Sequence, residues 1–267
     1  SQTVGTTLAT VKLTGSQNLT LNALPSTVRT VDASMMTGGL QLGAGSQTAS
    51  YTPFSTSNLQ SVAGGTGSDV LIFGTSFDSG DFTAGGLCDL GDGPDLVQIS
   101  LNRSFFGPSP FRNVEEVRIN ANLNQSMSFL GHTGLSSITV ESDASSDFLT
   151  LLSVPSPLVA LQFRGDGTAS AQTFDTVNHQ ATGATGPNDT LTINVNNRGT
   201  PATAKTVGGQ AMVVNNFEIL NINCADGPCT FSGINDTTLA TLNVTGNSAV
   251  SLGQVDAAGS TINSISA

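Results

Sequence analysis

The chain has 267 residues and a formal net charge of −11, with eight Lys and Arg against 19 Asp and Glu. So few basic residues exclude nucleic acid as a partner, because phosphate binding needs clustered Lys and Arg. Hydrophobic residues make up 37% of the chain, too many for a disordered Ser/Thr-rich stalk, but none of their runs reaches the roughly 20 residues that span a membrane.

One short apolar pattern returns along the chain: an apolar residue, two others, an apolar residue, one other, and an apolar residue. Its copies, in chain order, are Leu8/Val11/Leu13, Val28/Val31/Ala33, Val114/Val117/Ile119, Leu135/Ile138/Val140, Leu158/Leu161/Phe163, Phe217/Leu220/Ile222, Leu239/Leu242/Val244 and the start of a copy at Ile262/Ile265. Several copies are followed by a turn and a second alternating run, as Leu19 and Leu21 follow Thr14-Gly15-Ser16. Alternation with period two is typical of β-strands.

This repeat predicts an all-β fold, a right-handed parallel β-helix or β-solenoid with coils of about 20–23 residues, formed by residues 1–267 as one domain. A single coil cannot bury its own apolar face, whereas stacked coils bury a continuous core. The segments Thr6–Gly15 and Thr237–Gly246 match beyond the apolar positions, which indicates internal duplication.

Two other architectures compete with the solenoid. A β-sandwich would also contain short strands with frequent turns. A leucine-rich repeat has a similar apolar pattern. However, this sequence lacks the Asn or Cys that follows that pattern in such repeats, and it lacks the helical segment that completes each of them.

Two stretches, 34–58 and 164–210, are rich in Gly, Thr, Ala and Asn and depart from the short repeat. We interpret them as enlarged coils or exposed loops. A domain boundary, if the chain has one, is expected within 164–210.

The segment Gly64–Ile72 fits the nonapeptide G-G-x-G-x-D-x-U-x at every fixed position, and Leu90–Gln98 repeats most of it about one coil later. Glycines in such turns expose backbone carbonyls and the aspartate adds a carboxylate, which suits Ca²⁺ with its six to eight oxygen ligands. The candidate calcium ligands are Gly65, Gly67, Asp69, Gly91, Asp92, Gly93 and Asp95. The alternative is that each aspartate caps a turn through backbone hydrogen bonds.

Weaker candidates surround these turns. Asp78 and Asp81 lie between the two nonapeptides and are further candidate ligands. Asp147 and Asp189 stand in degenerate copies without the glycines, and we interpret these as plain turns that lead into strands.

The three cysteines leave two possibilities open. Cys224-Ala-Asp-Gly-Pro-Cys229 brackets a turn, so a disulfide there is sterically reasonable, or both thiols stay free. Cys88 is left over and is interpreted as a small buried apolar residue.

With these features in hand, the chain resembles the calcium-binding RTX-type proteins of Gram-negative bacteria, and most closely their surface-layer members. The resemblance rests on Gly64–Ile72, Leu13–Leu21, Val28–Leu42, Val114–Ile119 and Phe217–Ile222. It implies type I export, folding triggered by calcium outside the cell, and a crystalline lattice with calcium at subunit contacts. This chain departs from that family in having one intact nonapeptide and one near copy rather than many.

The favoured function is therefore structural: a segment or subunit of a calcium-dependent bacterial surface layer that associates with itself or with other surface-layer subunits, with cell-surface polysaccharide as a further candidate partner. An RTX adhesin or biofilm matrix protein is the alternative. A polysaccharide-active β-helix enzyme is a third reading, but the basic residues are scattered, and neither His132 nor His179 stands in a nucleophile or zinc motif. We expect no catalytic role.

Overall fold

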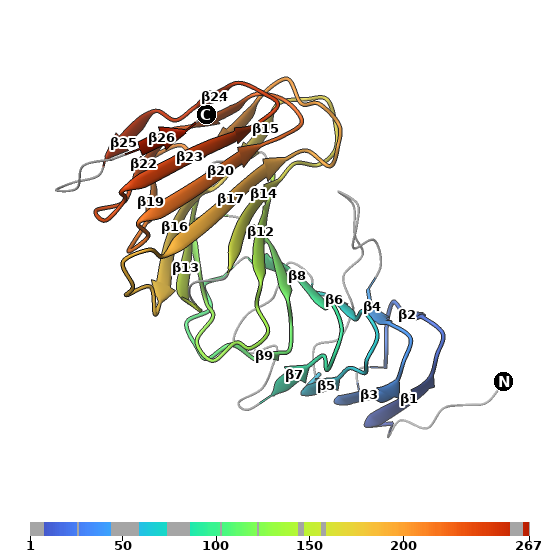
Figure 1. Ribbon diagram of the computed structural model, residues 1–267. Helices are drawn as coiled ribbons and strands as arrows, with labels where there is room; N and C mark the ends of the chain where they lie inside the picture. The colour runs from blue at the N-terminus through green and yellow to red at the C-terminus, as the bar shows by residue number, and fades with distance from the viewer. Residues whose placement is uncertain are drawn as a thin grey trace. The chain divides into compact units, whose positions relative to one another are not determined.

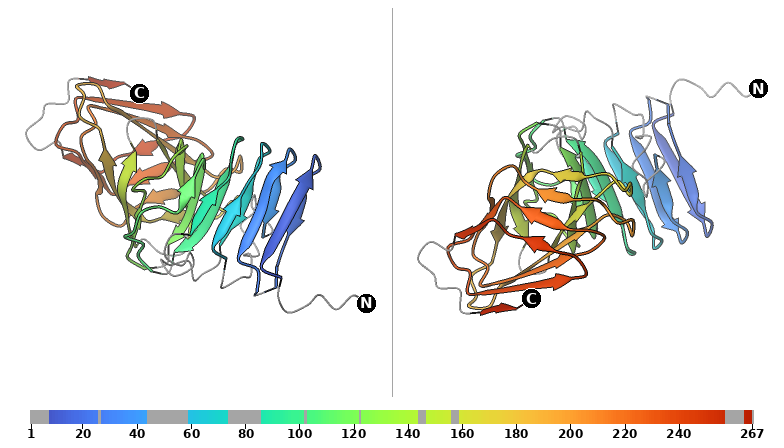
Figure 2. Two further views of the ribbon diagram at one scale, coloured as in Figure 1. Left: turned by 90° about the horizontal axis from the view of Figure 1, so that it is seen from below. Right: turned by 90° about the horizontal axis from the view of Figure 1, so that it is seen from above.

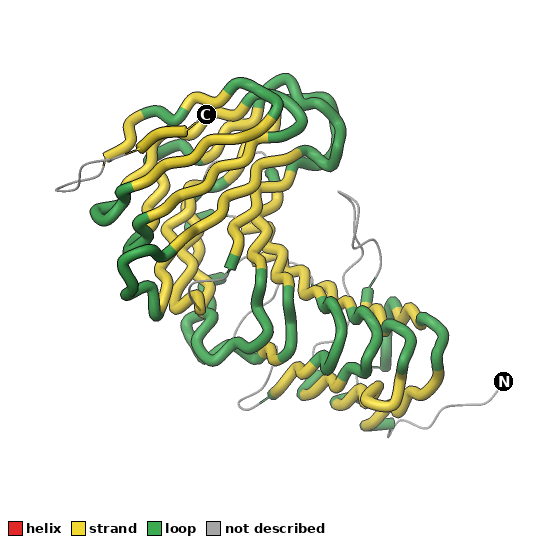
Figure 3. Tube along the Cα trace, viewed as in Figure 1, coloured by secondary structure: helices red, strands yellow, loops and turns green. Residues whose placement is uncertain are grey.

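The chain folds into β-strands alone. The structure, a computed structural model, describes residues 8–25, 27–43, 59–73, 86–101, 103–121, 123–143, 147–155, 159–256 and 264–266, which contain no helix (Figures 1 and 3). Its parallel sheets stack as a right-handed parallel β-solenoid of about 9 turns. The predicted fold class is confirmed, and parallel pairing throughout the named strands excludes the β-sandwich, whose sheets are antiparallel.

Two compact units make up the solenoid, and each is described by itself. The first contains Ser1–Arg103, Gly107–Arg118 and Gly131–Leu135, and the second contains Ser104–Phe106, Ile119–Leu130 and Ser136–Ala267. The stretch 164–210, where the sequence allows a boundary, lies wholly within the second unit. It forms regular strands there, including Thr176–Thr182 and Thr190–Asn196.

In the first unit each coil contributes two strands, one to each of two sheets, and Figure 2 shows these strands stacked side by side. The β3 sheet contains β1 (Thr10–Gly15), β3 (Thr30–Met36), β5 (Ser61–Ala63), β7 (Leu87–Asp89) and β9 (Phe111–Arg112). The β6 sheet, our name for the strands of an 11-stranded sheet that lie in this unit, contains β2 (Leu19–Leu21), β4 (Leu40–Leu42), β6 (Val70–Ile72) and β8 (Leu96–Leu101). Strand β10 (Glu116–Ala121) has residues in both units.

In the second unit most coils contribute three strands. The β17 sheet, our name for the strands of the 11-stranded sheet that lie in this unit, contains β12 (Ser137–Glu141), β14 (Ala160–Arg164), β17 (Thr190–Asn196), β20 (Ile219–Cys224), β23 (Thr241–Gly246) and β26 (Ser264–Ser266). The β13 sheet contains β11 (Gln125–Ser128), β13 (Phe148–Pro155), β16 (Thr176–Thr182), β19 (Met212–Val214), β22 (Gly233–Asn235) and β25 (Gln254–Asp256). The β18 sheet contains β15 (Gln172–Phe174), β18 (Lys205–Val207), β21 (Cys229–Phe231) and β24 (Val250–Ser251).

The apolar pattern of the sequence forms the core. Equivalent residues of successive copies pair in register, as Ile138 pairs with Leu161 and Leu220 with Leu242, and all four are at most 1% exposed. Each inward side chain therefore packs on its counterpart in the next coil. Burying one such side chain stabilises the fold by about 1.5–3 kcal/mol.

Coil length varies more than the repeat indicates. Residues at the same position of adjacent coils are 22 residues apart for Asn221 and Asn243, but 29 apart for Asp189 and Glu218. The prediction of 20–23 residues describes the short coils, and the longer ones accommodate larger turns between in-register strands.

Candidate functional site

The two nonapeptide turns lie one above the other in the first unit. Val70 of β6 pairs with Leu96 of β8, so Asp69 and Asp95, the residues just before these strands, occupy equivalent places 26 residues apart. Both aspartates are buried, Asp69 at 0% and Asp95 at 1% exposure. The sequence thus placed the two turns correctly, on adjacent coils.

The glycines of these turns allow neighbouring coils to approach closely. Gly91 has φ +84°, and a Cβ there would lie 2.2 Å from the Gly65 carbonyl oxygen. Gly93 has φ +136°, and a Cβ there would lie 2.3 Å from the Gly67 carbonyl oxygen. The Gly65 carbonyl also accepts a hydrogen bond from the Asp92 backbone N–H at 2.9 Å. Contact between stacked turns therefore accounts for the glycine pattern.

The carboxylates of Asp69, Asp95 and the partly buried Glu115 form a ladder, in which each accepts a backbone N–H from the preceding coil. Asp69 Oδ1 accepts from Leu40 N–H at 2.6 Å, and its Oδ2 accepts from Gly65 N–H at 3.1 Å. Asp95 Oδ1 accepts from Asp69 N–H at 2.7 Å. Glu115 Oε2 accepts from Asp95 N–H at 2.8 Å. These bonds satisfy buried amide donors in the turns that lead into the strands and at the start of β4.

Burial dominates the electrostatics of this ladder. Desolvation raises the pKa of Asp95 to about 7, although the hydrogen bond from Asp69 N–H acts against it; the nearby carboxylates of Asp69, Glu115 and Asp89 raise it further. Burial also raises the pKa of Asp69, opposed by the N–H bonds from Leu40 and Gly65. Asp95 Oδ2 is buried and has no hydrogen-bond partner among the described residues.

The hydrogen bonds of this donor set already involve several of its oxygens. Both Asp69 oxygens and the Gly65 carbonyl accept hydrogen bonds, Asp95 Oδ2 is buried without a hydrogen-bond partner among the described residues, and the Asp92 side chain is exposed to solvent. Calcium needs six to eight oxygens. Within the described ranges, no group of three or more His, Cys, Asp or Glu is arranged to hold a metal ion.

Calcium binding by the seven candidate residues therefore stays a prediction. The structure brings Gly65, Gly67, Asp69, Gly91, Asp92, Gly93 and Asp95 together in two adjacent turns. Asp78 and Asp81 lie outside the described residues.

The second unit repeats the same carboxylate-to-backbone bond. Asp189 N–H donates to Glu218 Oε2 at 2.9 Å, in the β17 sheet. In the β13 sheet, Leu123 N–H donates to Asp147 Oδ2 at 3.0 Å, and Asp147 N–H donates to Asp175 Oδ1 at 3.1 Å. Asp147 and Asp189 each stand directly before a strand, as the sequence predicted for the degenerate copies.

Sequence reasoning missed Glu115, the next member of the first ladder. Its only signal was position: an acidic residue 20 residues after Asp95, just ahead of a strand with the apolar repeat. A glutamate reaches the same amide with one more methylene, so the nonapeptide template does not identify it.

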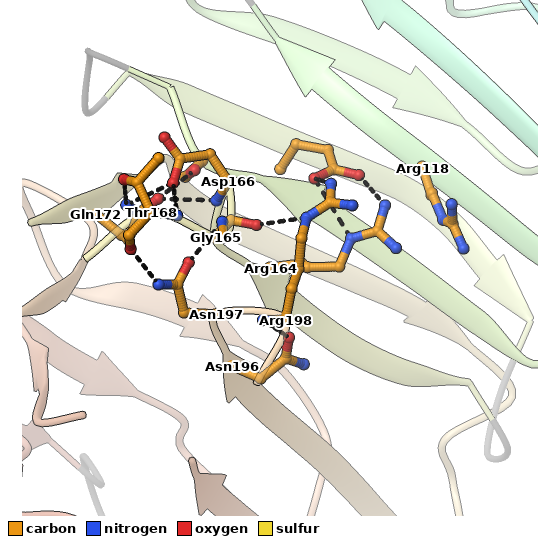
Figure 4. Close-up of polar contacts among 12 residues, drawn as sticks. Arg118, Arg164, Gly165, Asp166, Thr168, Gln172, Asn196, Asn197 and Arg198 are labelled. Atoms are coloured by element: carbon orange, nitrogen blue, oxygen red, sulfur yellow. Dashed lines mark hydrogen bonds and ion pairs between the residues drawn. The ribbon is translucent and has the colours of Figure 1, made fainter. Parts of the chain in front are cut away.

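Sequence reasoning also treated the basic residues as scattered, whereas two arginines meet in the second unit. Arg164 and Arg198 lie close together in Figure 4. Both bind Glu141: Arg164 through Nε and Nη2, and Arg198 through Nη2 at 3.1 Å. The three side chains are only 10–17% exposed. Arg198 Nε also donates to the Gly165 carbonyl at 2.8 Å, so this cluster joins three successive coils.

A disulfide joins Cys224 and Cys229, which settles the open alternative, and Cys88 is buried with a free thiol. The loop that the disulfide closes contacts Lys205, a fully buried residue of β18. Lys205 Nζ donates to the Ala225 carbonyl at 2.5 Å and to the Gly227 carbonyl.

No helix in the described part of the chain is long and apolar enough to cross a membrane. No protein-family model, curated protein or solved structure matches this chain.

Proposed function

We propose that this chain is a structural protein of the bacterial cell surface, a segment or subunit of a surface layer exported by type I secretion. The observation that carries the proposal is the bonding between coils. In both units, buried side chains stack in register and carboxylates accept N–H groups from the preceding coil. Such a stack resists deformation along its whole length and needs no catalytic centre.

Two further features support a place outside the cytoplasm. The Cys224–Cys229 disulfide is typical of oxidising compartments. The net charge of −11 would make copies of the chain repel one another, and a divalent cation would reduce that repulsion. Calcium therefore enters the proposal at contacts between subunits, where exposed carboxylates such as Asp92 are available.

The test is assembly of the purified chain in millimolar calcium and in excess chelator. Analytical ultracentrifugation and negative-stain electron microscopy should show ordered assemblies with calcium and dispersed protein with chelator. Asp92→Ala should weaken assembly without changing the melting temperature. A chain that stays monomeric in both solutions would contradict the proposal.

A further inference from the structure

One face of the second unit is built from amide and hydroxyl side chains. Strands β17 and β20 alternate between buried and outward residues, and β23 does so at its start: Leu191, Ile193, Leu220, Ile222 and Leu242 are buried, and the residues between them point outward. At the start of these strands the outward residues are Thr190, Ile219 and Thr241. We call the remaining outward set the asparagine face; it comprises Thr192, Asn194, Asn196, Asn221, Asn223, Asn243 and Thr245.

Parallel pairing aligns the asparagine face into columns. Thr192, Asn221 and Asn243 form one column, with one residue from each coil. Gln162, Asn194, Asn223 and Thr245 form the other. Neighbouring strands lie about 4.8 Å apart, so each column presents a polar group at that repeat.

Hydrogen bonds along the columns orient the amides. Asn243 Nδ2 donates to Asn221 Oδ1 at 2.8 Å, and Asn223 Nδ2 donates to Asn194 Oδ1 at 3.5 Å. Each such bond uses one of two N–H donors and one of two acceptor lone pairs, so an amide keeps capacity for a ligand. Asparagine is disfavoured in strands, and five outward asparagines on three strands oppose that local preference. Departures of this kind are expected at functional sites.

Charge defines the partner that this face can accept. Strands β17, β20 and β23 contain no charged side chain, although the whole chain carries −11. At the margin of the face, Arg164 and Arg198 are paired with Glu141, and the Asp166 carboxylate interacts electrostatically with Arg198, so these four charges sum to zero. An acidic polymer would find no net positive charge here, whereas a neutral one can approach without an electrostatic penalty.

We propose that the asparagine face binds a neutral polysaccharide. Sugar hydroxyls both donate and accept hydrogen bonds, as the outward amides and threonine hydroxyls do. A chain with repeating hydroxyls can bond to several coils at once, so that weak single contacts add. This binding does not depend on assembly into a surface layer.

The test uses the full chain in chelator, to separate binding from calcium-dependent assembly. Cellulose, a β-1,3-glucan and dextran serve as neutral probes, and alginate as the acidic comparison, in sedimentation or affinity electrophoresis. The chain should bind at least one neutral polymer and should not prefer alginate. The triple variant N221A/N223A/N243A should weaken that binding about tenfold or more.

The matched control is T173A/T206A/T230A, which removes an aligned outward column from the β18 sheet and should bind as the unmodified chain does. If the triple asparagine variant unfolds by circular dichroism, the single change at the exposed Asn223, Asn223→Ala, replaces it and should weaken binding measurably. Absence of binding to all three neutral polymers, preference for alginate, or equal loss in the threonine control would overturn the proposal.

Discussion

At the scale of single residues, the second unit contains two buried polar groups, one with hydrogen-bond partners and one without. Lys205 is fully buried, and its ammonium is satisfied by carbonyls of the loop that Cys224–Cys229 closes. Burial lowers its pKa, while Asp226 raises it. His179 is 1% exposed, and both ring nitrogens have no hydrogen-bond partner among the described residues. The Lys205 ammonium is stabilised by its hydrogen bonds, whereas burying the His179 ring without such bonds costs free energy.

The disulfide should stabilise Lys205 as well as the loop. Cys224→Ser with Cys229→Ser should cost about 2 kcal/mol from loop closure, plus the loss of ordered acceptors around a buried ammonium. In a Lys205→Met background the same pair should cost less. Urea unfolding of the four proteins gives the coupling energy, and strict additivity would show that loop and lysine act independently.

His179 should destabilise the fold, and more so in acid. Burial lowers its pKa to about 4, so the unfolded chain, with a pKa near 6.5, binds the proton more readily between these values. Above pH about 6.5 this difference in pKa has no effect on the free energy of unfolding, and it lowers that free energy progressively as pH falls towards 4. His179→Leu should raise the free energy of unfolding by about 1–3 kcal/mol at pH 7.5, with a larger gain at pH 5. Urea titrations at both pH values measure this; a gain that shrinks in acid would contradict it.

At the scale of elements, the turn before a strand is the connection between coils. A carboxylate in that turn accepts the N–H of the equivalent residue in the coil before, as Asp95 does for Asp69 and Glu218 does for Asp189. Glycines in the nonapeptide turns bring the coils close enough for these bonds. The turn thus stabilises the stack through hydrogen bonds and close backbone contact.

Asp69→Ala should leave the N–H groups of Leu40 and Gly65 unpaired and lower stability by about 1–3 kcal/mol. Because this loss comes from backbone hydrogen bonds, we expect it in chelator as well as in calcium. Thermal melts in both solutions, with the exposed Asp92→Ala as control, provide the measurement. A loss seen only in calcium would instead support Asp69 as a calcium ligand.

Gly91→Ala and Gly199→Ala form a matched pair. Both glycines have positive φ, +84° and +80°, but only Gly91 faces a neighbouring carbonyl, and nothing lies within 4 Å of a Cβ at Gly199. Gly199→Ala should cost about 1–2 kcal/mol from backbone strain alone. Gly91→Ala should cost about 2 kcal/mol more, because neighbouring backbone must move. Equal losses in urea unfolding would show that close approach between coils is unimportant.

At the scale of the whole molecule, stability among the described coils should be lowest at the edge strand of a stack. In β1, Val11 is only half-buried, whereas Val31, its partner in β3, is fully buried. The first described coil has a neighbour on one side only within its sheet. An end coil therefore gains about half the contacts of an internal one.

Amide hydrogen exchange should follow this order. Amides of β1 should exchange through local fraying, faster than those of β3, while β17 and β20 should exchange slowest in the second unit. Exchange measured by mass spectrometry tests the order. Uniform protection across β1 and β3 would mean that residues beyond the described coil cover it.

The sequence by itself determined the solenoid. Periodic apolar residues such as Ile138, Leu161, Leu220 and Leu242 have one stable arrangement, because stacking in register buries all of them at once. The same reasoning placed Asp69 and Asp95 on adjacent coils. It also located the Cys224–Cys229 turn, though not whether the two thiols were bonded.

Only the tertiary structure decided what the polar residues contact. Asp69 accepts two backbone N–H groups, and Arg198 meets a glutamate 57 residues away. Periodicity predicts the face of a side chain, but such partners depend on turn lengths, which vary from coil to coil. The asparagine face could not be predicted for the same reason. Asn194, Asn223 and Thr245 align in one column because turns of different lengths bring the successive strands into the same register.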